Sequence, residues 1–289
     1  MIYTVTLNPS IDYVVNMDQL TEGAVNRVNT EHFYAGGKGI NVSQILNQHE
    51  IDIIALGFIS GFTGDFIQSS LHEKGIKTDF IPLKEGYSRI NMKVKTLSDE
   101  TEINGSGPKI SNEEIEKLYQ KLDGLTSEDT LVLAGSIPAS LPDDFYEQIM
   151  KYVAPKQVKV IVDATKNLLL NVLKYQPFLI KPNHHEIAEM FNVTISSTED
   201  LLHYGNQLKE MGAQNVLISM GGDGAILISE TGEIYSSNVP KGTVKNSVGA
   251  GDSMVAGFIA GYQKDASYEE ALRLGAASGS ANAFSSDVA

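Results

Sequence analysis

The sequence Asn-Ser-Val-Gly-Ala-Gly-Asp-Ser-Met-Val-Ala-Gly-Phe, residues 246–258, joins a glycine-rich bend to the start of a helix. The first N–H groups of a helix have no partner within it, and the helix dipole adds positive charge there. Gly249, Ala250 and Gly251 therefore form a candidate anion site. Asp252 would repel a bound anion, which favours a catalytic base beside a phosphate. Taken alone, the motif also fits a turn followed by a helix cap, because Asp is a favoured N-cap residue.

A second glycine cluster, Gly-Gly-Lys-Gly-Ile-Asn-Val-Ser, occupies residues 36–43. Gly36 and Gly37 let the backbone approach a ligand closely, and Lys38 adds a positive charge among them. The cluster is not a Walker A loop, because no glycine lies five residues before Gly37 and no Ser or Thr follows Lys38. Apolar residues at helical spacing follow, so Asn41 falls near the start of a helix. A flexible turn with a solvated lysine fits the same residues.

The composition is that of an acidic globular protein without cysteine. The chain has 289 residues, of which 42% are hydrophobic, and a formal net charge of −14. This charge opposes nonspecific binding to nucleic acid or to an anionic membrane, and a phosphate ligand would need local cations to overcome it. The lack of cysteine excludes disulfides and thiolate metal sites. No apolar run could span a bilayer and no basic segment opens the chain, so we expect a cytoplasmic protein.

Strand and helix patterns alternate along most of the chain. Strands are predicted at residues 2–7, 51–57, 130–134, 158–162, 178–180 and 216–219, and helices at 64–74, 111–122, 143–153, 166–173, 197–211 and 267–284. This alternation indicates an α/β fold with a largely parallel sheet covered by helices on both faces. Ligands of such sheets bind beyond the carboxyl ends of the strands. Polar residues that follow strands or open helices should therefore share one edge: Asp12 just past the first strand, then 135–136, Asp163, 181–186, 219–224 and 249–252.

Two stretches differ from this parallel core. Residues 13–33 are polar with short alternations, and a hairpin is predicted within residues 89–104. Their polar alternation is typical of a sheet that is solvated on one face. We therefore expect a single domain over residues 1–289 with a small β lid formed by about residues 12–34 and 87–106.

These features resemble the ribokinase-like PfkB family of sugar kinases along nearly the whole chain. The two family signatures match residues 36–42 and 248–253, and the family's Asn-x-x-Glu motif matches Asn183 and Glu186. The resemblance implies a ribokinase-like α/β fold, in which a β lid closes over the sugar. It also implies ATP and Mg²⁺ as cofactors, and a homodimer formed through the lid.

The resemblance assigns roles to the matching residues. Asp252 would take the proton from the acceptor hydroxyl, and the backbone N–H groups of residues 249–251 would stabilise the transferring phosphoryl group. The residues expected to contact the sugar are Asp12, Gly36, Gly37 and Asn41. Those expected to contact the nucleotide are Lys181, Asn183, Ser219, Gly221, Gly222, Gly224 and Asn282. Mg²⁺ would be bound, mostly through water, by Asn183, Glu186 and Asp163. Structural roles are the alternative, such as a cap for Asp163 and a first-turn carboxylate for Glu186.

The positions of cations set the expected substrate. Arg27, Lys38 and Arg89 are candidates for binding a phosphate on the sugar, which an unphosphorylated sugar would not require. The Gly-Gly-Lys-Gly form and residues 89–94 resemble bacterial 1-phosphofructokinases most closely, with tagatose-6-phosphate kinases as near relatives. The resemblance implies transfer from ATP to D-fructose 1-phosphate, which gives fructose 1,6-bisphosphate. Tagatose 6-phosphate and fructose 6-phosphate are the alternative substrates.

Other function classes fit the sequence less well. A dinucleotide oxidoreductase would need a GxGxxG motif after the first strand, and a sugar-phosphate sensor without activity would have less reason to keep Asp252. His184 and His185 are adjacent and point to different sides of a helix, which does not favour a transition metal. Two departures from the family pattern are Asn-Ser at residues 246–247, where Asp-Thr is frequent at a monovalent-cation site, and the end of the chain at Ala289, where a further helical segment is expected.

Overall fold

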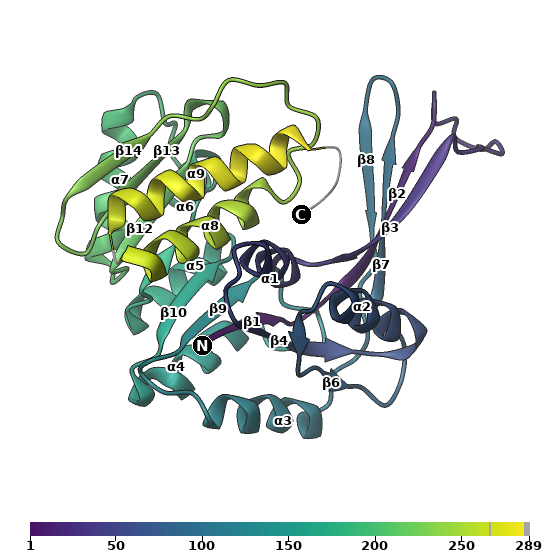
Figure 1. Cartoon of the computed structure of the whole chain (residues 1–289), viewed down its shortest axis with the longest axis horizontal. Coiled ribbons are helices and arrows are strands. Elements are labelled where there is room, and N and C mark those ends of the chain that lie inside the picture. The colour runs from purple at the N-terminus through teal and green to yellow at the C-terminus, as the bar shows by residue number, and fades with distance from the viewer. Residues whose placement is uncertain (266, 286–289) are drawn as a thin grey trace.

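The computed structural model describes residues 1–265 and 267–285, and the end of the chain at Ala289 lies outside these ranges. The strands form two sheets, one of ten strands and one of four (Figure 1). In Figure 1 the small sheet rises at the upper right, beside the edge of the large sheet and across from α8 and α9. Within the described ranges, no helix has the length and apolar character needed to cross a membrane.

The large sheet is parallel over most of its width. Its order is β14–β13–β12–β11–β10–β9–β1–β4–β5, with β6 paired to β4. The strands are β1 (Ile2–Thr6), β4 (Ile53–Ile59), β5 (Lys77–Thr78), β6 (Ile81–Pro82), β9 (Thr130–Ala134), β10 (Lys159–Asp163), β11 (Leu179–Ile180), β12 (Asn215–Ser219), β13 (Ala225–Ile228) and β14 (Ile234–Ser237). The pairs from β4 to β12 are parallel, whereas β13 and β14 are antiparallel to their neighbours. The carboxyl ends of β1, β9, β10, β11 and β12 therefore meet at one edge, as the alternation predicts.

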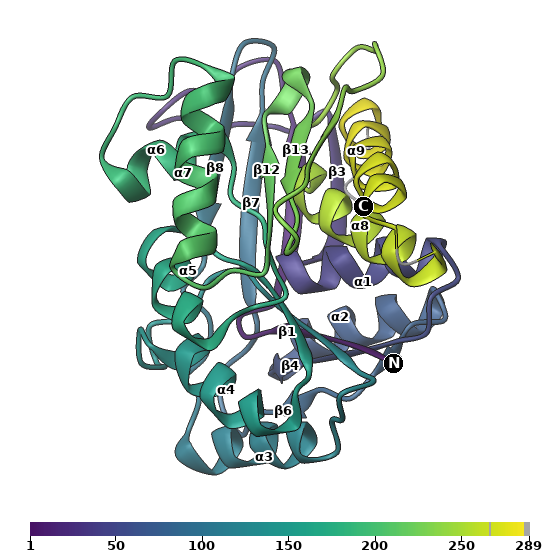
Figure 2. The ribbon, with the colours of Figure 1, turned by 90° about the vertical axis from the view of Figure 1, so that its left-hand side faces the viewer.

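Helices cover both faces of the large sheet (Figure 2). One face carries α1 (Lys38–Gln48), α2 (Gly61–Glu73), α8 (Ala250–Asp265) and α9 (Tyr268–Phe284). The opposite face carries α3 (Asn112–Asp123), α4 (Phe145–Val153), α5 (Lys166–Val172), α6 (His184–Phe191) and α7 (Thr198–Glu210). Each set buries its apolar residues against the strands in a separate hydrophobic cluster. The predicted α/β class is confirmed.

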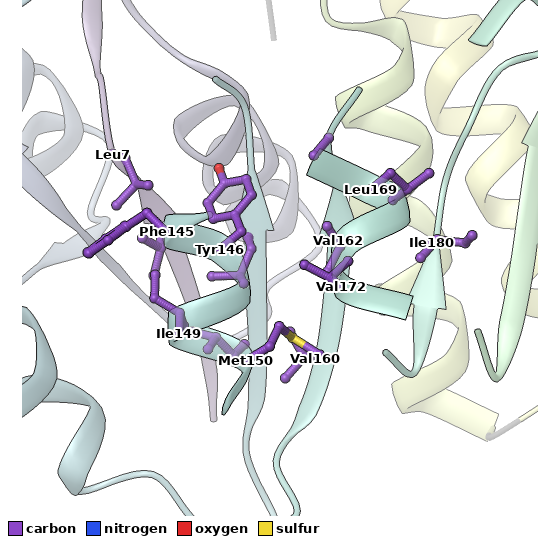
Figure 3. Packing of buried hydrophobic residues seen from close by; sticks show 14 of the residues in the cluster. Leu7, Phe145, Tyr146, Ile149, Met150, Val160, Val162, Leu169, Val172 and Ile180 are labelled. Carbon is purple, nitrogen blue, oxygen red and sulfur yellow. The ribbon is translucent and has the colours of Figure 1, made fainter. Parts of the chain in front are cut away.

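Helix α4 shows how the core holds the functional edge of the sheet (Figure 3). Phe145, Tyr146, Ile149 and Met150 follow helical spacing and are all buried. The Tyr146 hydroxyl donates a hydrogen bond to the carbonyl oxygen of Gly135 at 3.0 Å. Burial raises the pKa of Tyr146, so the hydroxyl keeps its proton and remains a donor. The loop after β9 is thereby tied to the hydrophobic core.

The small sheet contains β3 (Thr30–Gly36), β2 (Ser10–Asn16), β7 (Arg89–Lys95) and β8 (Glu100–Asn104), in that order. The central pair β2–β7 is parallel, and the two outer pairs are antiparallel. The predicted hairpin is therefore present, but the prediction that Asp12 lies just past the first strand, outside any strand of its own, is wrong. Asp12 is the third residue of β2, because its pairing with Tyr34 and Asn91 extends this strand back to Ser10.

Candidate active site

A cleft of about 1600 Å³ lies between the carboxyl edge of the large sheet and one face of the small sheet. It is far larger than one sugar and has room for two ligands side by side. The predicted site residues that line it are Asp12, Gly37, Lys38, Asn41, Arg89, Asp163, Lys181, Asn183, Glu186, Ser219, Gly221, Gly222, Gly249, Ala250, Gly251 and Asp252. Residues far apart in the sequence are thus brought to one cavity by the sheet topology.

Four predicted residues lie outside the lining. Arg27 is exposed in the loop between β2 and β3, away from the cleft. Asn282 is buried in α9, whose residues 279, 280 and 283 face the cleft instead. Gly224 has a φ of +96°, and a Cβ there would lie 2.1 Å from the carbonyl oxygen of Ser237, so this glycine is needed for the backbone path. The fourth residue, Gly36, lies directly against the carboxylate of Asp12.

The glycine-rich bend leads directly into α8. Gly249 has a φ of +81°, a left-handed conformation that favours glycine, and Ala250 is the first residue of the helix. The Ala250 N–H donates a long hydrogen bond of 3.3 Å to the carbonyl oxygen of Ser247. A Cβ on Gly251 would lie 3.2 Å from Lys181 Nζ, so this ammonium lies against the bend. The arrangement places a cation and a helix N-terminus together, and both favour binding of a phosphate.

Asp252 lies at the centre of a buried network of polar side chains. Its Oδ2 accepts a hydrogen bond of 2.8 Å from Asn41 Nδ2, and its Oδ1 is 3.5 Å from Lys38 Nζ. Lys38 Nζ also contacts Asp163 Oδ2 at 3.0 Å, and Lys181 Nζ is 3.4 Å from Asp163 Oδ1. Two lysines and two aspartates therefore alternate across the edge of the sheet. Four segments supply them, and each lies at the end of a strand or at the start of a helix.

The two carboxylates of this network differ in acidity. Burial raises the pKa of Asp252, while the Lys38 ammonium and the Asn41 hydrogen bond oppose that increase in part. Burial also acts to raise the pKa of Asp163, but Lys181 and Lys38 outweigh it and lower this pKa to about 2. Asp163 raises the pKa of Lys38, so this lysine stays charged. Asp163 is thus the fixed anion between the lysines, and Asp252 is the carboxylate suited to accept a proton.

Asn183 and Glu186 form a capping box at the start of α6. The Glu186 N–H donates to Asn183 Oδ1 at 2.8 Å, and the Asn183 N–H donates to Glu186 Oε2 at 2.8 Å. Asn183 also pairs with Ser219 in an isolated bridge, which brings the ends of β11 and β12 together. The structural role anticipated for Glu186 is therefore real, and both residues still line the cleft. The oxygen Glu186 Oε1 accepts no hydrogen bond from the residues described.

The small sheet presents a second polar cluster to the cleft, around Asp12. Asp12 Oδ1 accepts hydrogen bonds from Ser10 Oγ at 2.8 Å and from Asn91 Nδ2 at 3.2 Å. Asp12 Oδ2 is 3.1 Å from Lys93 Nζ. A Cβ on Gly36 would lie 2.6 Å from Asp12 Cγ, so Gly36 leaves the space that this carboxylate occupies.

Several lining residues were missed by the sequence reasoning. They include Asn8, Asn91, Lys93, Glu102, Asn104, Thr165, residues 238–242, Ala276, Gly279, Ser280, Ala283 and Phe284. Asn91 and Lys93 could have been found, because they lie two and four residues beyond Arg89 in a strand of period two and so share its face. The segment 238–242 carries no periodic signal, and only its position beside α9 brings it to the cleft.

Comparison with known proteins agrees with this geometry. The model of the pfkB family carbohydrate kinases matches residues 5–289. The chain is 50% identical over 288 residues to the 1-phosphofructokinase of Bacillus subtilis, which covers 100% of this chain and 94% of that protein. It is 39% identical over 286 residues to the D-tagatose-1-phosphate kinase of Bacillus licheniformis, with 99% and 93% covered.

The fold is also similar to that of a solved kinase. The crystal structure of phosphofructokinase-2 from Escherichia coli in complex with potassium matches with a TM-score of 0.92 and 26% identity, over 99% of this chain and 94% of that one. Fold, signature positions and full-length similarity agree. The chain therefore belongs to the pfkB family of carbohydrate kinases, enzymes that transfer a phosphoryl group to a sugar hydroxyl.

Proposed function

We propose that the protein transfers the γ-phosphoryl group of ATP to the 6-hydroxyl of D-fructose 1-phosphate, which gives fructose 1,6-bisphosphate and ADP. The observation that carries this proposal is the buried Asp252, held by Asn41 and Lys38 directly beside the glycine-rich bend. The relatives named 1-phosphofructokinase support the choice of sugar phosphate. ATP as donor fits the cytoplasmic location that the sequence predicts.

Asp252 is proposed to act as the general base. Its raised pKa makes it a stronger proton acceptor than an exposed aspartate, and its burial keeps water from replacing the acceptor hydroxyl. The hydroxyl oxygen attacks the phosphorus as its proton passes to Asp252, and ADP leaves with the bonding electrons. Backbone N–H groups of residues 249–251, together with Lys181, would stabilise the charge on the transferring group.

Arg89 is the proposed site for the phosphate that the sugar already carries. Lys38, Lys93 and Lys181 are each within 4.0 Å of a carboxylate, whereas Arg89 has no such partner in the described part of the chain. Its Nε donates to the carbonyl oxygen of Asn8 at 3.1 Å, which fixes the guanidinium and leaves its terminal nitrogens for a ligand. Arg27 remains a second candidate, although its loop would have to move towards the cleft.

The nucleotide is proposed to lie along the other half of the cleft. Lys181, Asn183 and Ser219 would contact its phosphates, and Gly221 and Gly222 would let the backbone approach it closely. Residues 238–242 and the cleft-facing side of α9 would enclose the base. This extent explains why the cleft is larger than one sugar.

Mg²⁺ is proposed to bind between the nucleotide phosphates and the start of α6. No group of three or more His, Asp or Glu side chains among the described residues could hold a metal alone, which suits an ion that keeps several waters and takes phosphate oxygens. Glu186 Oε1 and the Asn183 side chain would hold it, with Asp163 acting through water because two lysines already neutralise it. When bound, Mg²⁺ neutralises charge on the phosphates.

We further propose that the small sheet is a lid and that two copies pair through it. Tyr13, Phe33, Met92 and Ile103 are cross-strand neighbours on the face opposite Asp12 and Asn91. Tyr13 and Phe33 stack at 4.5 Å between ring centroids, and Phe33 and Ile103 are exposed. An apolar stripe of this kind is typical of a covered surface. Replacing Phe33 by Glu should shift the mass in solution to that of one chain, whereas an unchanged mass would contradict pairing through this face.

The test of function is ADP release with Mg-ATP on fructose 1-phosphate, tagatose 1-phosphate, fructose 6-phosphate, tagatose 6-phosphate and unphosphorylated fructose. A preference in kcat/KM for fructose 1-phosphate is the expected result. Preference for a tagatose phosphate or for fructose 6-phosphate would support the alternative kinases. Tagatose kinases are among the relatives of this chain. Activity on unphosphorylated fructose alone would contradict the role given to Arg89, and no activity on any sugar would support a sensor without activity.

A further inference from the structure

Asn91 has a buried acceptor that no protein group satisfies. Its side chain lines the cleft and the residue is 8% exposed. Its Nδ2 donates to Asp12 at 3.2 Å, whereas its Oδ1 has no hydrogen-bond partner. A buried polar atom left unpaired is costly, and such atoms in native structures usually have a partner. The missing partner must be a donor, and a hydroxyl of a ligand in the cleft would supply it.

Lys93 is a buried cation that lies outside the network of Asp252 and Asp163. It is 5% exposed and lines the cleft, with Nζ 3.1 Å from Asp12 Oδ2 and 4.0 Å from Glu102 Oε1. These are the carboxylates within ion-pair distance of Lys93 in the described part of the chain. A buried ion pair often stabilises a protein no more than apolar residues of similar volume would. Its presence beside a cleft therefore favours a functional role. An ammonium has three N–H donors, which leaves at least one for a ligand oxygen.

Asp12 is held in place by three polar neighbours. Ser10 and Asn91 donate to Oδ1, and Lys93 lies beside Oδ2. A carboxylate offers about four lone-pair positions, so at least one remains for a hydroxyl donor. The three side chains together offer two acceptors and one donor on a single face of the sheet.

Asp12 is the sugar contact that the family resemblance already implies. We propose that Asn91 and Lys93 join it in a subsite, called here the hydroxyl triad, that binds the ring hydroxyls of the sugar. In this subsite Asn91 Oδ1 and Asp12 each accept a hydroxyl proton, and Lys93 donates to a hydroxyl oxygen. The inference deepens the proposed function and rests on it. In the furanose form of fructose 1-phosphate, O5 closes the ring and the 6-hydroxyl accepts the phosphoryl group. The hydroxyls on C2, C3 and C4 remain, and the triad is proposed to bind those on C3 and C4. Fructose and tagatose differ only at C4, which makes the triad the element that distinguishes them.

The role of Asn91 is tested by a thermodynamic cycle that removes the Asn91 side chain, a sugar hydroxyl, or both. Asn91→Ala and the wild type are compared on fructose 1-phosphate and on its 3-deoxy and 4-deoxy analogues, with kcat/KM as the readout. We expect Asn91→Ala to lower kcat/KM on the parent sugar roughly tenfold to a hundredfold. The analogue that lacks the hydroxyl bound by Asn91 should show little further loss in the variant. Losses that simply multiply for both analogues would overturn the assignment, because independent groups do not couple.

The role of Lys93 is tested with a matched control in the same strand. Lys95 lies two residues further along β7, pairs with Glu100 at 3.9 Å and lies outside the cleft lining. Lys93→Met should raise KM for the sugar phosphate roughly tenfold or more and reduce the preference between fructose and tagatose phosphates. Its kcat and its KM for ATP should stay within about threefold of the wild type, and Lys95→Met should change little.

The possible failures can be told apart. If Lys93→Met loses kcat, ATP affinity and thermal stability together with sugar affinity, the lysine is structural and the triad is refuted. If the wild type phosphorylates fructose 1-phosphate while the deoxy cycle shows no coupling, the proposed function stands and the triad is again refuted. If the wild type phosphorylates no sugar phosphate, the proposed function fails and the triad fails with it.

Discussion

Replacing Asp252 by Asn removes the proposed base while keeping the shape of the side chain. The introduced amide can still pair with Asn41, because the Asn41 amide can turn over and offer its own Oδ1, which has no partner. Lys38 keeps its contact with Asp163 at 3.0 Å, so the cation is not released into the cleft. The variant should therefore fold, and it should bind the sugar phosphate nearly as well as the wild type.

The expected loss is in the chemical step. A positioned general base contributes about 10²–10⁴ in rate, which corresponds to about 3–5 kcal/mol of transition-state free energy. Asp252 is 5% exposed, and water has little access to replace it as a proton acceptor. We therefore expect kcat to fall about 10³-fold or more, towards the upper part of that range.

The assay combines steady-state ADP release with calorimetric titration of fructose 1-phosphate. A loss of kcat with a Kd unchanged to within about threefold would agree with a role confined to the transition state. A fall in kcat of less than about tenfold would refute the assignment of Asp252 as base. A parallel loss of sugar affinity would show instead that Asp252 is needed to shape the site.

Three further predictions concern space, charge and metal. Gly36→Ala should raise KM for the sugar phosphate about tenfold or more, because the new Cβ would lie 2.6 Å from Asp12 Cγ, while Gly124→Ala, with nothing within 4 Å, is the matched control. Equal effects of the two changes on KM would contradict this reasoning. Lys38→Met should move the acid limb of the pH profile of kcat/KM to higher pH, because Lys38 lowers the pKa of Asp252 and loss of Lys38 therefore raises that pKa. An acid limb at the same pH as in the wild type would show that another group titrates. Removal of Mg²⁺ with EDTA should stop ADP release and leave sugar phosphate binding intact by calorimetry, and release that continues would exclude the proposed metal.

The sequence was sufficient to predict the central sheet and the edge where the site forms. Buried strands and helices differ in their hydrophobic period, and the residues after each strand must meet wherever the pairing is parallel. Lys181 and Asp163 were found by this reasoning alone. The position of Asp12 was not, because the short link of residues 7–9 between two different sheets has no period of its own. Only the pairing of Asp12 with Asn91 across β2 and β7 reveals where the first sheet ends and the second begins.

The contacts within the site were harder to predict than its location. Lys38 and Asp163 are 125 residues apart in the sequence, and no pattern in either segment indicates that they form an ion pair. The sequence therefore suggested Lys38 for a substrate phosphate and Asp163 for Mg²⁺, whereas the two side chains contact each other at 3.0 Å. Both side chains still line the cleft, but each is already paired with an opposite charge. Their partnership depends on the three-dimensional juxtaposition of β10 and α1.

The acidity of the chain bears on how it could bind anionic ligands. The net charge is −14, and the residues that line the cleft include more Asp and Glu than Lys and Arg. Long-range attraction therefore does not bring a phosphate to the site. Binding must instead depend on groups that act at contact distance: the backbone at the start of α8, the Lys181 ammonium against Gly251, and the Arg89 guanidinium fixed by Asn8. Paired lysines are less mobile than free ones, so the carboxylates that reduce the net attraction also hold these cations where a phosphoryl group would pass.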